Sequence, residues 1–199
     1  RVVGGIARVV YDLSHRLIKD GHEVTVVTYR EGGASYFEDD KGVKVYRVDN
    51  YMINPNNFID WIMQMNFNMV TKVNQIIAEQ GGFDVIHAHD WLVANAAKSI
   101  KNSYNIPIVA TIHATEAGRN SGIHDETQRY INDTEWMLTY EASEVIVNSN
   151  YMKNELNVIL KTKEEIIDTN TLEIVLDDNI EVETNMNHIY ESLYKIYNL

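Results

Sequence analysis

Three short segments of the chain carry residue types that suit ligand binding. The first is Gly4-Gly5, directly before an apolar helical stripe that begins at Ile6. Two glycines before a helix let the backbone approach a ligand closely, and the helix N-terminus adds free N–H groups and partial positive charge. A diphosphate suits such a turn, but a plain tight loop entering a helix has the same pattern.

The second segment is His87-Ala88-His89-Asp90-Trp91. On an extended strand His87 and His89 point to the same side. Two imidazoles beside a carboxylate can bind a metal, can hydrogen-bond to sugar hydroxyls, or can be satisfied groups at a strand end. No third or fourth ligand is evident, so we expect no metal site. Asp90 suits the N-cap of the next helix, and the flat ring of Trp91 suits either a sugar or the core.

The third segment, residues 111–120, follows an apolar strand and carries His113, Glu116 and Arg119. His113 can donate a hydrogen bond to a hydroxyl or to developing charge. Arg119 can hold a phosphate through two parallel hydrogen bonds, or it can form an ion pair with Glu116 on a surface loop. Spacing alone leaves both uses of Arg119 open.

The elements that position these segments alternate between helix and strand. Apolar spacing predicts helices over residues 6–20, 57–80, 91–101 and 125–142, and a further helix that starts at Ser149 or Asn150. Strands are predicted over residues 22–28, 43–48, 83–88, 106–112 and 144–148, with a loop over residues 113–124.

This alternation indicates βαβ units and an α/β fold with a Rossmann-like, doubly wound and mostly parallel sheet. Ligands of such sheets bind beyond the carboxyl ends of the strands. That rule selects the loop before Ile6, residues 87–90 and the loop that opens at His113.

Composition narrows the class of protein further. The chain has 199 residues, 45% of them hydrophobic, and no apolar run long enough for a membrane helix. It lacks an initial Met, so we expect a fragment or a processed chain. The absence of cysteine fits the cytoplasm, and a net charge of −12 argues against a nucleic-acid partner. A neutral glucan remains compatible with this charge.

Together and in this order, the segments resemble family 4 glycosyltransferases with the GT-B fold, including members similar to glycogen and starch synthases. The resemblance covers residues 1–156. The stretches that carry it are residues 1–8, 21–28, 83–91, 111–119, 135–142 and 148–152.

The resemblance implies two Rossmann-like domains that face each other across a cleft. The N-terminal domain mainly holds the acceptor, and the C-terminal domain holds the nucleotide-sugar. It also implies transfer of glucose from ADP-glucose or UDP-glucose to a glucan, with retention of anomeric configuration and without a metal or other cofactor.

Matched position by position, the resemblance also implies roles for single residues. Gly4 and Gly5 approach the donor diphosphate, His113 reaches the donor sugar and its reacting face, and Arg119 also belongs to the donor side. His113 and Asp90 are the implied catalytic residues. The residues implied to line the acceptor side are His89, Asp90, Trp91 and Glu116.

The chain also departs from the family pattern. The strand that normally opens the fold is missing, which is expected to expose two neighbouring strand edges. There is no Asn-Gly linker, and residues 157–199 are an acidic tail without Gly or Pro. That tail contains a possible strand over residues 172–176, which is a candidate to fill the gap, and a possible helix over residues 186–197.

We therefore expect an N-terminal, acceptor-side domain over residues 1–156. The C-terminal nucleotide-binding domain is either missing or supplied by a second chain, so the isolated chain is predicted to be inactive. Two alternatives stay open: a non-catalytic carbohydrate-binding or assembly module derived from such an enzyme, and a nucleotide-sugar epimerase with the same fold.

Overall fold

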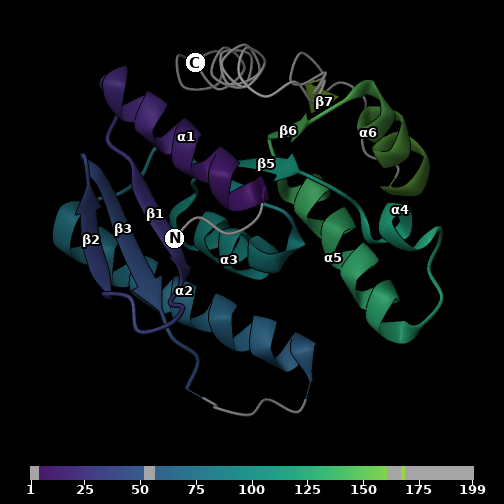
Figure 1. Ribbon diagram of the computed structural model, residues 1–199, viewed down its shortest axis with the longest axis horizontal. Coiled ribbons are helices and arrows are strands. Elements are labelled where there is room, and N and C mark those ends of the chain that lie inside the picture. The colour runs from purple at the N-terminus through teal and green to yellow at the C-terminus, as the bar shows by residue number, and fades with distance from the viewer. Residues whose placement is uncertain (1–4, 52–56, 161–166, 169–199) are drawn as a thin grey trace. The chain divides into compact units, whose positions relative to one another are not determined.

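The computed structural model describes residues 5–51, 57–160 and 167–168 (Figure 1). The chain divides into two compact units, Arg1–Gly82 and Phe83–Leu199. Each unit contains its own β-sheet, and the residues of the second and third sequence segments all belong to the second unit.

The sheet of the first unit has three strands in the order β1-β3-β2. β1 and β3 are parallel, and β2 is antiparallel to β3. The elements are α1 (Gly5–Lys19), β1 (Thr25–Tyr29), β2 (Phe37–Asp40), β3 (Val43–Val48) and α2 (Phe58–Gln80).

Local chemistry sets the bounds of the long helix α2. The side chain of Asn57 accepts a hydrogen bond from Asp60 N at 2.9 Å, which satisfies one of the free N–H groups of the first turn. Gly81 ends the helix with a φ of 97°, a conformation that L side chains seldom adopt. The helix buries one apolar face, which includes Ile62, Met69 and Ile76.

The predicted helices over 6–20 and 57–80 and the strand over 43–48 are confirmed. β1 starts three residues later than predicted. β2 was not predicted, because its sequence Phe-Glu-Asp-Asp is acidic and three of its residues are exposed. Pairing with β3 forms it, and Arg47 Nη2 lies 2.6 Å from Glu38 Oε2 across the pair.

The second unit contains an all-parallel sheet in the order β4-β5-β6-β7. All five residues of β5 are buried, as expected for a strand covered on both faces. The strands are β4 (Ile86–His89), β5 (Ile108–Ile112), β6 (Glu144–Val147) and β7 (Ile167–Asp168). The helices are η1 (Trp91–Val93), α3 (Ala94–Tyr104), α4 (Glu116–Asn120), α5 (Glu126–Glu141), α6 (Asn150–Glu155) and η2 (Leu156–Leu160).

The structure confirms the alternating order predicted for this unit, although β4 starts three residues later than the strand predicted over 83–88, and two further details are corrected. The predicted helix over 91–101 begins as a short 3₁₀ turn, η1, before α3 continues it. The predicted loop over 113–124 contains the short helix α4, capped by the Thr115 side chain. Both are local events of one turn, too short for apolar periodicity to reveal.

Among the described strands, β1 lies at one end of the first sheet and β4 lies at one end of the second sheet. The possible strand over 172–176 and helix over 186–197 lie outside the described residues. β7 was not predicted. None of the described helices is long and apolar enough to cross a membrane.

Candidate active site

The carboxyl ends of three parallel strands bring the candidate residues of the second unit together. His89 ends β4, His113 follows β5, and Asn148 follows β6. Because the strands are parallel, these ends lie at the same edge of the sheet. Asn148 Nδ2 donates to the carbonyl oxygen of His113 at 3.2 Å.

Asp90 is the residue that joins β4 to β5 at this edge. The residue is 2% exposed, and its Oδ1 accepts a hydrogen bond from His113 N at 2.7 Å. The prediction that Asp90 caps the following helix is wrong, since its side chain makes no cap hydrogen bond to η1. The carboxylate points across to the next strand instead. Burial raises the pKa of Asp90, and the hydrogen bond from His113 N opposes that rise.

The backbone of Asp90 has a φ of 60° and a ψ of 174°. This combination borders a region that only glycine adopts readily, so the conformation is strained by on the order of 1–3 kcal/mol. Two hydrogen bonds hold this conformation. Asp90 N donates to Thr111 O at 2.9 Å, and the Asp90 carboxylate accepts from His113 N. Backbone strain of this kind concentrates at functional sites.

Three imidazoles lie in contact beside Asp90. The rings of His87 and His89 are 4.2 Å apart between centroids, which confirms that they point to the same side. His89 Nδ1 lies 3.1 Å from His113 Nε2, and His87 Nε2 lies 2.7 Å from Thr111 Oγ1. One proton is shared between His89 and His113, because one ring nitrogen of that pair must donate and the other accept.

All three histidines are held in the neutral form. Burial lowers the pKa of His87 to about 3. Burial is also the largest cause that lowers the pKa of His89 and of His113; Asp90 opposes it at His113 and Arg119 reinforces it. At neutral pH these rings can donate or accept hydrogen bonds, but they supply no positive charge.

Arg119 supplies the positive charge at this site. Its Nη2 lies 3.5 Å from Asp90 Oδ2, and its side chain is 41% exposed. The ion-pair partner of Arg119 is thus Asp90 and not the alternative Glu116, whose carboxylate accepts from Asn120 Nδ2 at 2.9 Å. A guanidinium has five N–H donors, so the partly exposed Arg119 can contact Asp90 and still donate hydrogen bonds to a ligand.

The remaining predicted residues lie elsewhere. Trp91 is 4% exposed, so its ring packs in the core, and its acceptor role stays a prediction. Gly4 lies outside the described residues. Gly5 is the first residue of α1 in the other unit, and apart from its chain neighbours and its own helix backbone no heavy atom comes within 4 Å of the position its Cβ would occupy. The donor-binding role of both glycines stays a prediction.

Sequence reasoning missed two carboxylates that hold the loop after β5. Glu135 accepts from Glu116 N with Oε1 at 2.9 Å and with Oε2 at 3.1 Å. Glu155 accepts from the hydroxyl of Thr115. One signal was available, since Glu135 lies on the same helical stripe as Ile131 and Leu138, and a carboxylate on a core-facing stripe needs a partner.

Within the described ranges, no group of three or more His, Cys, Asp or Glu side chains is arranged to hold a metal ion. The three clustered histidines do not form such a group with Asp90. Their ring nitrogens contact each other and the hydroxyl of Thr111 instead.

Residues 3–167 match the family model described as Glycosyltransferase Family 4. The chain belongs to glycosyltransferase family 4. A glycosyltransferase of Methanocaldococcus jannaschii is 35% identical over 165 residues, which cover 83% of this chain and 41% of that protein. The glycogen synthase of Mycobacterium tuberculosis is 32% identical over 169 residues, which cover 78% of this chain and 41% of that protein. The chain therefore spans about two fifths of the length of these family 4 relatives.

Solved structures confirm the predicted fold class. Sucrose-phosphate synthase from Thermosynechococcus elongatus superposes with a TM-score of 0.68 at 17% identity, over 79% of this chain and 40% of that chain. Arabidopsis thaliana UGT89C1, complexed with UDP-L-rhamnose, has a TM-score of 0.53 at 15% identity, over 88% of this chain and 49% of that chain. This family 4 chain thus has the α/β architecture with parallel sheets found in GT-B glycosyltransferases.

Proposed function

We propose that this family 4 chain forms the acceptor-side part of a retaining glycosyltransferase that moves glucose from ADP-glucose or UDP-glucose to a glucan. The observation that carries the proposal is the convergence of His89, Asp90 and His113 at the carboxyl edge of a parallel sheet in a family 4 chain. The glycogen synthase relative supports the choice of a glucan. The lack of cysteine fits a cytoplasmic location.

The chemistry of transfer matches what these side chains offer. The bond between the anomeric carbon and the diphosphate breaks, a bond to an acceptor hydroxyl oxygen forms, and the hydroxyl proton passes to the leaving diphosphate. Neutral histidines suit the hydrogen-bonding of sugar hydroxyls, and Arg119 can stabilise negative charge that develops on the leaving group. In this proposal no metal takes part.

Because of the shared proton, His113 can either donate a hydrogen bond to a sugar hydroxyl or accept one from it. When His89 donates to His113 Nε2, the proton of His113 is on Nδ1, which then donates to a hydroxyl oxygen. When His113 donates to His89, Nδ1 of His113 becomes an acceptor. The carboxylate of Asp90 holds the backbone of His113 in place for either arrangement.

The test is transfer of labelled glucose from ADP-glucose or UDP-glucose to glycogen. We expect negligible transfer by this chain alone and transfer when a separately expressed nucleotide-binding domain of a family 4 enzyme is supplied. EDTA should leave the rate unchanged, and NMR of the product should show the anomeric configuration of the donor. Robust transfer by the chain alone would contradict the proposal that a separate domain must bind the nucleotide-sugar.

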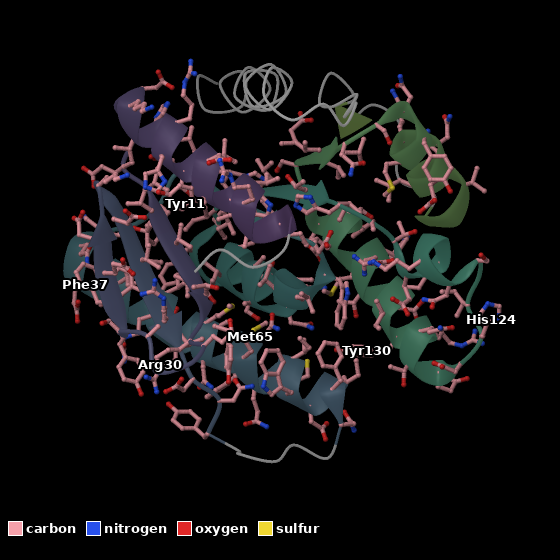
Figure 2. All side chains as sticks on the ribbon, viewed as in Figure 1. Tyr11, Arg30, Phe37, Met65, His124 and Tyr130 are labelled. Carbon is pink, nitrogen blue, oxygen red and sulfur yellow. The ribbon has the colours of Figure 1, made fainter. Side chains whose placement is uncertain are left out.

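Variants connect this activity to the site. His113→Ala should lower the rate by about a hundredfold or more, as expected for loss of a donor that acts on the reacting groups. His124→Ala is the matched control, because His124 lies on the loop between α4 and α5 and bonds to the backbone of Asn120 (Figure 2). Glucan binding without turnover, even with the second domain present, would favour a carbohydrate-binding module instead.

A further inference from the structure

The helix α4, which carries Arg119, is held by side chains from two other helices. Glu135 on α5 accepts from Glu116 N, the first N–H of α4, with both carboxylate oxygens. Glu155 on α6 accepts from the Thr115 hydroxyl, and that same hydroxyl accepts from Gly118 N at 3.0 Å. α4 lies beside α5 and α6 in Figure 1.

These contacts are needed because α4 has only five residues. A helix this short is unstable alone, and the N–H groups of its first turn have no partner within the helix. Thr115 and Glu135 satisfy two of them from positions that are 0% and 1% exposed. A carboxyl group buried to this extent would be unfavourable without a hydrogen-bond partner, so the contact with Glu116 N satisfies both groups.

Gly118 allows Glu155 to approach the backbone of α4 closely. A Cβ at this position would collide with the Glu155 carboxylate, which therefore packs directly against the glycine backbone. The sequence Thr115-Glu116-Ala117-Gly118-Arg119 thus contains both the hydroxyl that Glu155 binds and the small residue that lets it approach.

We propose that Glu135 and Glu155 are positioning residues of the transfer site, which hold the α4 turn so that Arg119 stays beside Asp90 and His113. The role in transfer rests on the function proposed above. The anchoring itself can be measured without turnover. Neither carboxylate touches the reacting groups, because both act through the backbone and the Thr115 hydroxyl.

The charge state of Glu135 supports this role. Burial raises the pKa of Glu135 to about 8, so the group is mostly neutral at pH 7, and its carbonyl oxygen still accepts from Glu116 N. A neutral Glu135 does not compete with Asp90 for the guanidinium of Arg119. The nearest ion pair of Arg119 is accordingly the one with Asp90 at 3.5 Å.

NMR titration of the histidines in this chain tests whether Glu135 acts through Arg119. The charged and titrating groups around His113 are His87, His89, Asp90 and Arg119. Arg119 lowers the pKa of His113. Glu135→Ala should therefore raise the titration midpoint of His113. Arg119→Ala should raise it as well, and the double variant should raise it no further than the larger single effect.

His87 is an internal reference for this experiment. Burial and His113, not Arg119, lower its pKa to about 3, so it should stay untitrated in all variants between about pH 5 and pH 8. Entry of His87 into this range together with His113 would show general loosening of the unit and overturn the positioning role. Glu126→Ala is the matched control, since Glu126 lies on the same helix and is 89% exposed.

Rescue and amide exchange complete the test. Glu135→Ala should speed exchange of the Glu116 amide about tenfold, the loss expected for one hydrogen bond. Glu135→Gln keeps an acceptor oxygen and should restore slow exchange. Glu155→Ala should speed exchange of the Gly118 amide in the same way. Unchanged exchange in both alanine variants, or a glutamine variant as fast as alanine, would overturn the proposal.

The same variants separate this proposal from the function on which it rests. Lost anchoring in Glu135→Ala with normal glucose transfer to glycogen would overturn the positioning role and leave the proposed function intact. Absent transfer by the unaltered protein with its second domain would overturn the proposed function and with it the role in transfer, while the exchange data would still establish the anchor.

Discussion

At the residue scale, Asp90 combines a buried carboxylate with a φ of 60°. An L side chain adopts this conformation at a cost, which the surrounding hydrogen bonds must offset. The hydrogen bond that the carboxylate accepts from His113 N offsets part of that cost. The strain and the bond can be separated by substitution, because alanine and glycine both remove the carboxylate and only glycine relieves the backbone.

Asp90→Ala should lower the free energy of unfolding by about 2–3 kcal/mol, since it leaves the His113 N–H without its acceptor and keeps the strain. Asp90→Gly should be about 1 kcal/mol more stable than Asp90→Ala. Urea unfolding measures both. Equal stability of the two variants would show that the backbone at this position is not strained.

Glu135 gives the site a pH dependence of stability. Burial first, and then the charges of Asp90 and Glu116, raise its pKa from 4.5 to about 8, while the hydrogen bond from Glu116 N and the charge of Arg119 oppose that rise. The folded state therefore keeps a proton that the unfolded state releases above pH 4.5. The free energy of unfolding must then fall as pH rises from 4.5 to about 8, and above pH 8 the contribution of this one proton to stability is lost.

Between pH 6.5 and 8 the buried histidines, with lowered pKa values, are neutral in the folded protein, whereas in the unfolded chain, with an ordinary pKa of about 6.5, they still release protons. In this range Glu135 should lower the free energy of unfolding by about 2 kcal/mol. Glu135→Gln lacks this proton but keeps the histidines, so its stability should rise slightly over this range and diverge from that of the unaltered protein. Parallel pH curves for the two proteins, measured by urea unfolding, would contradict this assignment.

At the element scale, the sequence predicted most helices and strands of both units, because long apolar stripes and buried strands have clear periods. It failed where tertiary contacts form the structure. β2 exists through its pairing with β3, and α4 exists through Glu135 and Glu155, which come from distant helices. No local pattern in residues 113–124 reports those partners.

The candidate site was likewise predicted only in part. The sheet rule placed His89, Asp90 and His113 at one edge because that rule needs only strand ends. The ion pair between Arg119 and Asp90 depends on tertiary structure, so sequence spacing offered Glu116 as a partner and did not reveal Asp90. The backbone strain at Asp90 has no sequence signal, since glycine would be expected there.

Helix α5 offers a test at this scale. The side chain of Asp125 accepts from Gln128 N at 2.8 Å and caps the helix that carries Glu135. Asp125→Ala should lower the free energy of unfolding by about 1 kcal/mol, whereas Asp125→Ser should keep most of the stability. Thermal unfolding of both variants measures the difference, and an alanine variant as stable as the serine variant would argue against the cap.

At the scale of the whole molecule, the net charge of −12 on 199 residues sets a long-range repulsion within the folded state. Raising the NaCl concentration from about 0.01 M to about 0.1 M shortens the screening length from about 30 Å to about 10 Å. The midpoint of thermal unfolding at pH 7 should therefore rise by a few degrees, at roughly 2–4 °C per kcal/mol.

The control for this salt effect is the same measurement near the isoelectric point of about 4.9, where the net charge is close to zero. There the added salt should leave the midpoint nearly unchanged. A rise of the same size at both pH values would assign the effect to general salting rather than to repulsion between carboxylates.

β7 lies on the outer side of β6, with Val145 opposite Ile167 and Ile146 opposite Asp168. A polypeptide cut at residue 156 would lack this neighbour, and the exposed N–H and C=O groups of β6 would be open to pairing with another molecule. Such a shortened protein should self-associate and precipitate more readily. Preparations for crystallisation or NMR are therefore best extended at least through residue 168.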